Sequence, residues 1–248
     1  MLHLEGRISV LAALAARRRR VQVVLVKSDL AADKAADLLT AAEAAGVPVR
    51  RVAGGELSAM VHGASHGGVV AVCGPMPRTT PDELLDLVAA ASGPPLLLML
   101  EGVDDARNLG FTLRTAHAVG VTAVLIKKHL WDFDETEVAR AASGALEHIP
   151  LVQFESIDLL RQLQKKGLRL YGCLAGVRRS LFRTRLDRPV ILAIGGEKRG
   201  LSGAVRNICD RFITIPSLAD ASSLSLSHAG AIVLGEALRQ RTRPRVRR

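Results

Sequence analysis

The feature that most constrains this chain is a regular alternation of apolar runs and amphipathic segments after Pro95. Continuous apolar strands separated by helices are typical of a parallel sheet that is covered on both faces. We therefore expect an α/β fold. The predicted strands are 96–101, 121–127, 168–174, 190–195 and 211–215, and the predicted helices are 106–119, 134–146, 155–166 and 226–241.

The residues before this pattern predict a separate, small α/β domain. It contains apolar strands at 21–26, 47–52 and 67–73 and an Ala-rich helix at 31–45. The following segment is rich in Gly and Pro around a short amphipathic helix at 82–91, so a domain boundary is expected there. The predicted organisation is a first domain at 1–74, a linker at 75–94 and a second domain at 95–248.

Composition and charge restrict the class of protein. Hydrophobic residues make up 48% of the chain but aromatic residues only 3%, so the cores must be built from Ala, Val, Leu and Ile. Lys and Arg number 34 against 24 Asp and Glu, which gives a formal charge of +10. This balance favours a polyanionic partner such as nucleic acid. Simple solubility, or a bias of the source genome toward Arg, explains the charge equally well.

The cysteines and the apolar stretches indicate a cytoplasmic protein. Cys73, Cys173 and Cys209 are odd in number and lack the C-x-x-C spacing, which argues against a disulfide framework or a zinc site. The longest apolar stretch, 96–100, is too short to span a bilayer, and the N-terminus lacks an apolar signal region. We expect neither a signal peptide nor a membrane segment.

Three loops that follow apolar runs are candidates for a site, because ligands bind at the carboxyl ends of parallel strands. The first, 100–116, places Asn108 at a helix start and Arg114 further along the helix. The second, 194–202, has two glycines and Glu197 directly after a strand. The third, 215–227, carries four serines, at 222, 223, 225 and 227. Taken singly, these residues also suit a helix cap, an ordinary turn and a loose Ser-rich loop.

In this order and spacing, the three loops resemble the three motifs of the SpoU, or TrmH-like, family of SPOUT methyltransferases. The family's Asn and Arg fall on Asn108 and Arg114, its Gly-Glu turn on Gly196 and Glu197, and its Ser-Leu-Asn-Val-Ser run on 223–227. The family's substrate-binding domain has a fold similar to ribosomal protein L30e and ends in a His-Gln-Gly-hydrophobic run. Here that run reads H-G-G-V-V-A, at 66–71. The resemblance covers nearly the whole chain.

The resemblance implies an S-adenosylmethionine-dependent ribose 2′-O-methyltransferase that acts on ribosomal or transfer RNA without a metal. It also implies a deep trefoil knot made by the second and third loops. Arg114 would anchor a nucleotide phosphate and stabilise the developing alkoxide, because a guanidinium is hard to deprotonate. Asn108, Glu197 and Ser223 would orient Arg114 and the ribose. The cofactor would lie on backbone groups near Leu174, Gly195, Gly196, Ile215 and Leu224.

One motif position departs from the family, because Ser225 replaces the family's Asn. A hydroxyl is shorter than an amide and lacks its two donors and one acceptor. The alternative reading is therefore a catalytically weak or inactive RNA-binding protein of the same fold. An unrelated α/β hydrolase is a second alternative, although the sequence has no P-loop, nucleophile elbow or paired carboxylates.

The resemblance also implies a homodimer whose active site is built from the knot and the helix 106–119. That helix carries Phe111, Leu113 and Val119, apolar residues that a monomer would have to cover in another way.

Basic and imidazole side chains outside the motifs complete the candidate residues. Arg17, Arg18, Arg19 and Arg20 are candidate contacts to RNA phosphates, with a solvated charged face as the alternative. His62 and His66 lack a third metal ligand nearby. His66 is expected to pack or hydrogen-bond at a domain edge. His117 and His228 lie beside the motif helices, where an ordinary surface position is the commoner alternative.

Overall fold

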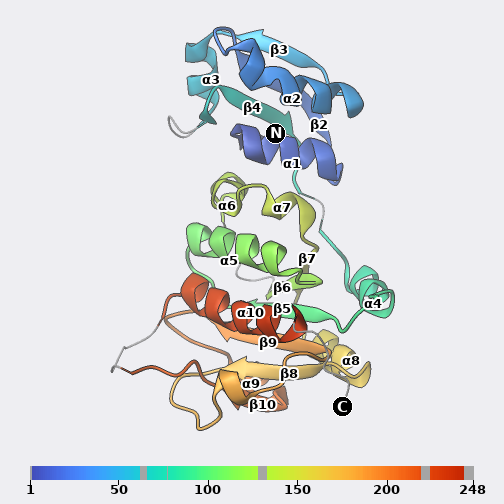
Figure 1. Cartoon of the computed structure of the whole chain (residues 1–248), viewed down its shortest axis with the longest axis vertical. Helices are drawn as coiled ribbons and strands as arrows, with labels where there is room; N and C mark the ends of the chain where they lie inside the picture. The colour runs from blue at the N-terminus through green and yellow to red at the C-terminus, as the bar shows by residue number, and fades with distance from the viewer. Residues whose placement is uncertain (1, 62–65, 77, 128–132, 219–223, 243–248) are drawn as a thin grey trace. The chain divides into compact units, whose positions relative to one another are not determined.

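The computed structural model describes residues 2–61, 66–76, 78–127, 133–218 and 224–242, and its elements are labelled in Figure 1. The chain divides into two units, each with its own sheet. Unit 1 comprises Met1–Pro77 with Phe133–His148, and unit 2 comprises Arg78–Asp132 with Ile149–Arg248. Within the ranges described, none of the helices combines the length and apolarity that crossing a bilayer requires.

Unit 1 contains a four-stranded sheet in the order β1-β4-β2-β3. Strand β4 pairs antiparallel with both β1 and β2, whereas β2 and β3 are parallel. Part of its core consists of Leu25, Val52, Leu57, Val61 and Val70. The elements are β1 (Leu2–Glu5), α1 (Arg7–Ala16), β2 (Val21–Lys27), α2 (Ala32–Ala44), β3 (Val49–Val52), α3 (Gly54–Met60), β4 (Val69–Cys73), α6 (Glu135–Ala142) and α7 (Ala145–His148).

Unit 2 contains a six-stranded, wholly parallel sheet in the order β10-β8-β9-β5-β6-β7. The predicted α/β class with a parallel sheet is therefore confirmed. The elements are α4 (Pro81–Ala89), β5 (Leu96–Glu101), α5 (Ala106–Val119), β6 (Ala123–Lys127), β7 (Leu151–Phe154), α8 (Asp158–Lys165), β8 (Arg169–Cys173), η3 (Leu181–Arg183), β9 (Val190–Gly195), α9 (Gly203–Ile208), β10 (Arg211–Ile213) and α10 (Leu226–Thr242).

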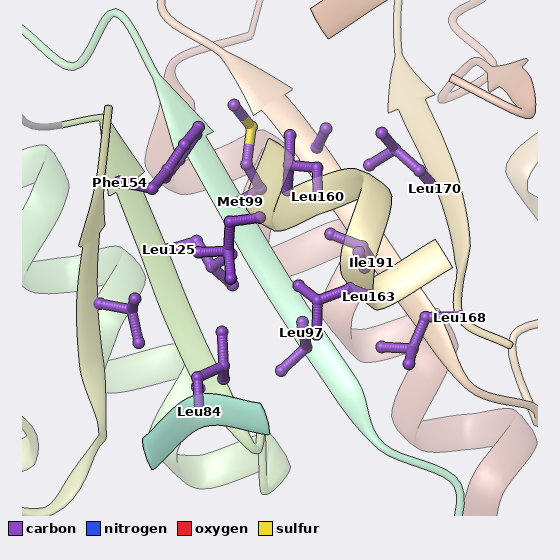
Figure 2. Close-up of a cluster of buried hydrophobic side chains, with 14 of the residues drawn as sticks. Leu84, Leu97, Met99, Leu125, Phe154, Leu160, Leu163, Leu168, Leu170 and Ile191 are labelled. Carbon is purple, nitrogen blue, oxygen red and sulfur yellow. The ribbon is translucent and has the colours of Figure 1, made fainter. Parts of the chain in front are cut away.

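The central strands of unit 2, β5, β6 and β9, are buried on both faces, as continuous apolar runs require. Figure 2 shows one face, where Leu97 and Met99 of β5 pack with Leu160 and Leu163 of α8. Leu84 of α4 joins this cluster, so α4 belongs to the core of unit 2 although it lies inside the segment predicted as a linker. The end of the first domain at 74 and the start of the second at 95 stay predictions.

The other face of the sheet is covered by α5 and α10, which lie side by side in Figure 1. Gly230 of α10 marks the contact. A Cβ atom at this position would lie 3.3 Å from Thr112 of α5 and 4.0 Å from Ile194 of β9. The small residue thus lets α10 approach both the neighbouring helix and the sheet.

One predicted helix, 134–146, is interrupted in the structure. Ser143 and Gly144 have φ angles of 48° and 86°, which end α6 before α7 begins. Both short helices pack in unit 1, with α6 against β1 and α7 against α1. Strand β7, which the sequence analysis did not include, follows directly and forms the end of the unit 2 sheet.

Candidate functional site at the carboxyl edge of the sheet

The loops after β5 and β9 meet beside the start of α10, at the carboxyl edge of the unit 2 sheet. Strands β5 and β9 are neighbours in parallel register, with Glu101 opposite Gly195, so the loops that follow them leave the sheet together. These loops and the first turn of α10 carry the residues that were singled out in the three motifs. Parallel pairing therefore brings together residues that are about ninety positions apart in the sequence.

Gly195 and Gly196 are required by a close approach of backbone segments. The N–H of Gly196 donates to the carbonyl of Glu101 over 2.6 Å. A Cβ atom on Gly196 would lie 1.7 Å from the Gly102 carbonyl oxygen, and one on Gly195 would lie 2.1 Å from the Gly200 carbonyl carbon. No larger residue fits at either position without moving a loop.

Asn108 is not the cap of its helix, as the simpler interpretation would require. Asp105 caps α5 instead, because its carboxylate accepts the Asn108 N–H over 2.7 Å. The Asn108 side chain is thereby free to point to other loops. Its Nδ2 atom lies 3.5 Å from Glu197 Oε1, and its Oδ1 atom accepts from Ser227 Oγ over 2.8 Å.

Glu197 connects the second loop to the other two. Besides Asn108, its Oε1 atom lies 3.4 Å from the N–H of Leu226, at the start of α10. The structure thus brings Asn108 and Glu197 together, as predicted from the motif order. Ser227, which the sequence analysis counted only as one of four serines, supplies the remaining connection. Its position at the end of a Ser-rich run was the only signal.

Ser225 continues this network toward His228. The Ser225 Oγ atom lies 3.1 Å from Ser227 Oγ and 2.5 Å from His228 Nδ1. His228 is exposed on the first turn of α10. Its imidazole therefore belongs to the candidate site, whereas the sequence favoured an ordinary surface position. Ser223, the third predicted orienting residue, lies outside the described residues.

Arg114 lies outside this network. It is exposed on α5, six residues after Asn108, and it makes no hydrogen bond or ion pair with the described residues. Six residues correspond to a rise of about 9 Å and a rotation of about 120° away from Asn108 around the helix. Among the described residues of the chain, the predicted catalytic Arg is therefore not part of the network.

The residues predicted to hold the cofactor follow neighbouring strands. Leu174 follows β8, Gly195 ends β9 with Gly196 after it, and Ile215 follows β10, while Leu224 precedes α10. Since β10, β8 and β9 are adjacent, the first four positions lie along one edge. Leu224 is 43% exposed. Among the residues that can be described, no group of three or more His, Cys, Asp or Glu is arranged to hold a metal ion.

A buried ion pair that the sequence analysis missed supports this edge. Glu101 ends β5 and binds Lys127, at the end of β6, with 2.7 Å between Oε1 and Nζ. Its other oxygen accepts the N–H of Ser202 over 2.8 Å. Burial alone would raise the pKa of Glu101, but Lys127 and the Ser202 N–H outweigh it and lower the pKa. The only sequence signal was opposite charges at the ends of two successive apolar runs.

The four arginines predicted as RNA contacts have different surroundings in unit 1. Arg17 and Arg20 are exposed, and Arg18 is half-buried. Arg19 is buried and bound to Glu147 over 2.8 Å and to Glu135 over 2.7 Å. Its guanidinium therefore serves the interior of unit 1 and is not available to a phosphate. The other three arginines stay predicted contacts.

His66 has the role expected of it, because its Nδ1 atom accepts the N–H of Gly68 over 3.1 Å. His62 lies outside the described residues. A hollow beside His66 is lined by residues at the end of β2, at the start of α2 and at the start of α3, including Lys27 and Lys34. These two lysines were not predicted as RNA contacts, because they are separated in the sequence and do not form a basic run.

A wholly parallel sheet with a polar network at its carboxyl edge defines an α/β enzyme domain. The chain belongs to the SpoU rRNA methylase family, whose sequence model matches residues 95–235, more than half of the chain. A second family model, described as RNA 2′-O ribose methyltransferase substrate binding, matches residues 3–78.

Named relatives resemble the chain over most of its length. The 23S rRNA (guanosine-2′-O-)-methyltransferase RlmB of Xylella fastidiosa is 38% identical over 223 residues, 90% of each chain. The protein of the same name from Photobacterium profundum is 34% identical over 234 residues, 94% of this chain and 95% of the relative.

Solved structures share the fold over nearly the whole chain. The SpoU methyltransferase AviRb from Streptomyces viridochromogenes, in complex with the cofactor AdoMet, is similar with a TM-score of 0.78 and 24% identity, covering 97% of this chain and 90% of AviRb. An AdoMet-bound rRNA methyltransferase from Sinorhizobium meliloti is similar with a TM-score of 0.79 and 22% identity, covering 96% of this chain and 86% of that one.

These matches confirm the predicted family, the activity as an RNA ribose 2′-O-methyltransferase and the cofactor S-adenosylmethionine. The RNA partner is confirmed at the level of class. The individual site residues stay predictions.

Proposed function

We propose that the protein methylates the ribose 2′-hydroxyl of a guanosine in 23S rRNA and acts in the cytoplasm as a homodimer. The observation that carries the proposal is the network from Glu197 through Asn108 to Ser227, which joins all three loops at one sheet edge. The named relatives support the choice of RNA and nucleotide. Methyl transfer needs such a fixed arrangement, because the acceptor oxygen must be held in line with the donor carbon.

The residues at the carboxyl edge fit S-adenosylmethionine, which supplies an electrophilic methyl group when bound. Leu174, Gly195 and Ile215 follow three adjacent strands and offer main-chain groups along one edge. The exposed side chain of Leu224 is suited to cover an aromatic ring. The proposal includes a trefoil knot made by 194–202 and 215–227, which rests on the family resemblance. Gly195 and Gly196 bring the loop after β9 to backbone distance of residues 200–201 and of Gly102.

Arg114 supports a homodimer. It is exposed and separated from the network of its own chain, yet the family motif assigns it to the reaction. We infer that Arg114 of one protomer reaches the site of its partner, where it binds a nucleotide phosphate and stabilises the alkoxide. Phe111 is 48% exposed on the same helix and suits the interface. Leu113 does not support it, because this side chain is fully buried within unit 2.

Unit 1 is the proposed RNA-binding part, with a fold similar to ribosomal protein L30e. Its sheet with helices, the family match over 3–78 and the lysines around the hollow support this assignment. Lys27 and Lys34 lie near the start of α2, where a phosphate is also favoured by the helix dipole. Arg17 and Arg20 extend the basic surface of the unit.

The experiment that tests the function uses purified full-length protein, labelled S-adenosylmethionine and unmodified 23S rRNA. Nuclease digestion and mass spectrometry should find 2′-O-methylguanosine at one position. Transfer RNA and 16S rRNA serve as controls and should stay unlabelled. Labelling of transfer RNA alone would overturn the choice of substrate. Bound cofactor and bound RNA without any transfer would instead favour an inactive member of the family.

A further inference from the structure

The first turn of α10 carries an imidazole that the three motifs do not explain. His228 is exposed and contacts Ser225, the residue that replaces the family's Asn. From this contact and its continuation to Glu197, we propose that His228 is a further catalytic residue, whose Nε2 atom accepts the proton of the ribose 2′-hydroxyl. The inference rests on the proposed function, because it assigns the proton acceptor of that reaction.

The donor and acceptor of each hydrogen bond in the network can be assigned by starting from Glu197. A carboxylate only accepts, so Glu197 fixes the amide of Asn108 with Nδ2 toward it and Oδ1 away from it. Oδ1 in turn only accepts, so the Ser227 hydroxyl must donate to Asn108. The single proton of Ser227 is thereby committed, and Ser227 Oγ can only accept from its next neighbour.

The same reasoning assigns the tautomer of His228. Ser225 Oγ lies 3.1 Å from Ser227 Oγ and must donate to it, so its own proton is also committed. The remaining contact, 2.5 Å between Ser225 Oγ and His228 Nδ1, then requires a proton on Nδ1. In a neutral imidazole this leaves the lone pair on Nε2, which has no hydrogen-bond partner among the described residues. The network therefore ends in an exposed base.

An imidazole suits the reaction better than the guanidinium that the motif supplies. Its ordinary pKa is about 6.5, near neutrality, whereas a guanidinium stays protonated. In the proposed step the ribose oxygen forms a bond to the methyl carbon, and the carbon–sulfur bond breaks with its electron pair going to sulfur. The 2′-hydroxyl proton passes to Nε2, and the resulting imidazolium is stabilised through the network by the negative charge of Glu197.

The charged groups on the segments around the first turn of α10 are consistent with stabilisation of the imidazolium by Glu197. Lys198, after β9, is paired with Asp104, after β5, over 3.0 Å. Asp105 is engaged in capping α5. Glu197 is the acidic group connected to the imidazole by the hydrogen bonds described above.

Ser225 also accepts the N–H of His228 over 3.4 Å, so the contact has a second interpretation as a helix cap. The two interpretations differ in what the imidazole ring does. A cap needs only the main-chain N–H of residue 228, so the side chain could be replaced without a specific chemical effect. A catalytic role needs the ring itself.

The test compares His228→Gln and His228→Ala with the wild type in single-turnover methyl transfer on 23S rRNA between pH 5.5 and 9. We expect a loss of about 10²- to 10⁴-fold, the usual contribution of a general base. We also expect loss of the rise in rate through the imidazole range, and partial rescue of His228→Ala by added imidazole. His148→Gln is the matched control, because His148 is exposed on α7 of unit 1 whereas the network belongs to unit 2, and this change should leave the rate unchanged.

Two readouts are independent of turnover. Calorimetry should give the same cofactor affinity for His228→Gln and the wild type. Nitrogen NMR of the free protein should show His228 protonated on Nδ1, and Ser225→Ala should shift that signal. A wild-type rate and pH profile in His228→Gln would overturn the inference, as would a proton on Nε2 in the free protein. Absence of transfer in the wild type at every pH would instead overturn the proposed function.

Discussion

At the scale of single residues, Asn108 shows why an amide is needed at the centre of the site. It donates toward a carboxylate with one end and accepts from a hydroxyl with the other. Asp would place a second negative charge beside Glu197, and Ser would not reach both partners. Because Asp105 is the residue that caps α5, the Asn108 side chain is not used as a helix cap.

Arg114→Ala should abolish methyl transfer and leave the affinity for S-adenosylmethionine within about twofold, since Arg114 is assigned to the phosphate and the alkoxide. Arg114→Lys should recover little, because an ammonium lacks the planar fork of the guanidinium. Steady-state kinetics measure the rate of methyl transfer, and calorimetry measures the affinity for S-adenosylmethionine. Arg161→Ala on α8 is the control and should change neither. An equal loss of rate and affinity would indicate a structural role for Arg114.

The motif residues could be predicted from the sequence, but their connections could not. Asn108 and Glu197 each follow an apolar run, and strand order alone places such positions at one edge. Ser227 and His228 differ, because a hydroxyl or imidazole on a helix surface is common and nothing local shows what it faces. Their roles depend on the packing of α10 against β9 and against α5, and α5 lies more than a hundred positions earlier in the sequence.

At the scale of elements, the ion pair between Glu101 and Lys127 joins the ends of β5 and β6 beneath the site loops. Because the pKa of Glu101 is lowered in the folded chain, its ionised form contributes stability above the usual Glu range, around pH 4.3. That contribution is lost as the pH falls through the lowered folded-state pKa.

Glu101→Gln should therefore lower the free energy of unfolding at pH 7 by about 1–3 kcal/mol, since Lys127 loses its partner. The difference from the wild type should shrink as the pH falls below about 4.3. Urea denaturation of both proteins at a series of pH values measures this difference in the free energy of unfolding. A difference that is constant from pH 7 to pH 3 would show that the charge of Glu101 contributes nothing.

Arg19 performs the corresponding role in unit 1, where it joins the end of α1 to α6 and α7 through Glu135 and Glu147. Arg19→Ala should cost about 3–5 kcal/mol, because two carboxylates then lose a buried partner. Arg20→Ala, at the exposed neighbouring position, should change stability by less than about 0.5 kcal/mol. Chemical denaturation compares the two. Similar small effects would mean that the buried ion pairs are not structural.

The elements that could be predicted are those whose pattern is long or strongly apolar. The predicted bounds of β5, β9 and α5 agree with the structure to the residue. Strands β1 and β7 have only four residues each, too few for a periodic pattern to stand out. The interruption between α6 and α7 depends on the positive φ of Ser143, a conformation that few non-glycine residues adopt and that no local signal predicts.

At the scale of the whole molecule, the separation of Arg114 from the network predicts that active sites are shared between protomers. Arg114→Ala and Glu197→Ala should each be inactive alone. Mixed dimers isolated through both tags should recover about half of the wild-type activity, because each contains one complete site of two. The unfractionated mixture should recover about a quarter, because about half of its dimers are mixed. Co-expression with two affinity tags and a transfer assay test this. No recovery in confirmed mixed dimers would place Arg114 in the site of its own chain.

The network at the carboxyl edge is proposed to direct a methyl group to a ribose 2′-oxygen. The most direct measurement uses a 23S rRNA fragment whose acceptor guanosine, once mapped, is replaced by its 2′-deoxy form. Transfer of the labelled methyl group and binding to the protein are measured for this deoxy fragment. The same measurements are made for the fragment that keeps the 2′-hydroxyl. The deoxy fragment should bind as tightly as the fragment with the 2′-hydroxyl but should receive no methyl group. Continued methylation of that nucleotide would contradict the proposal, because the methyl group would then be going to the base.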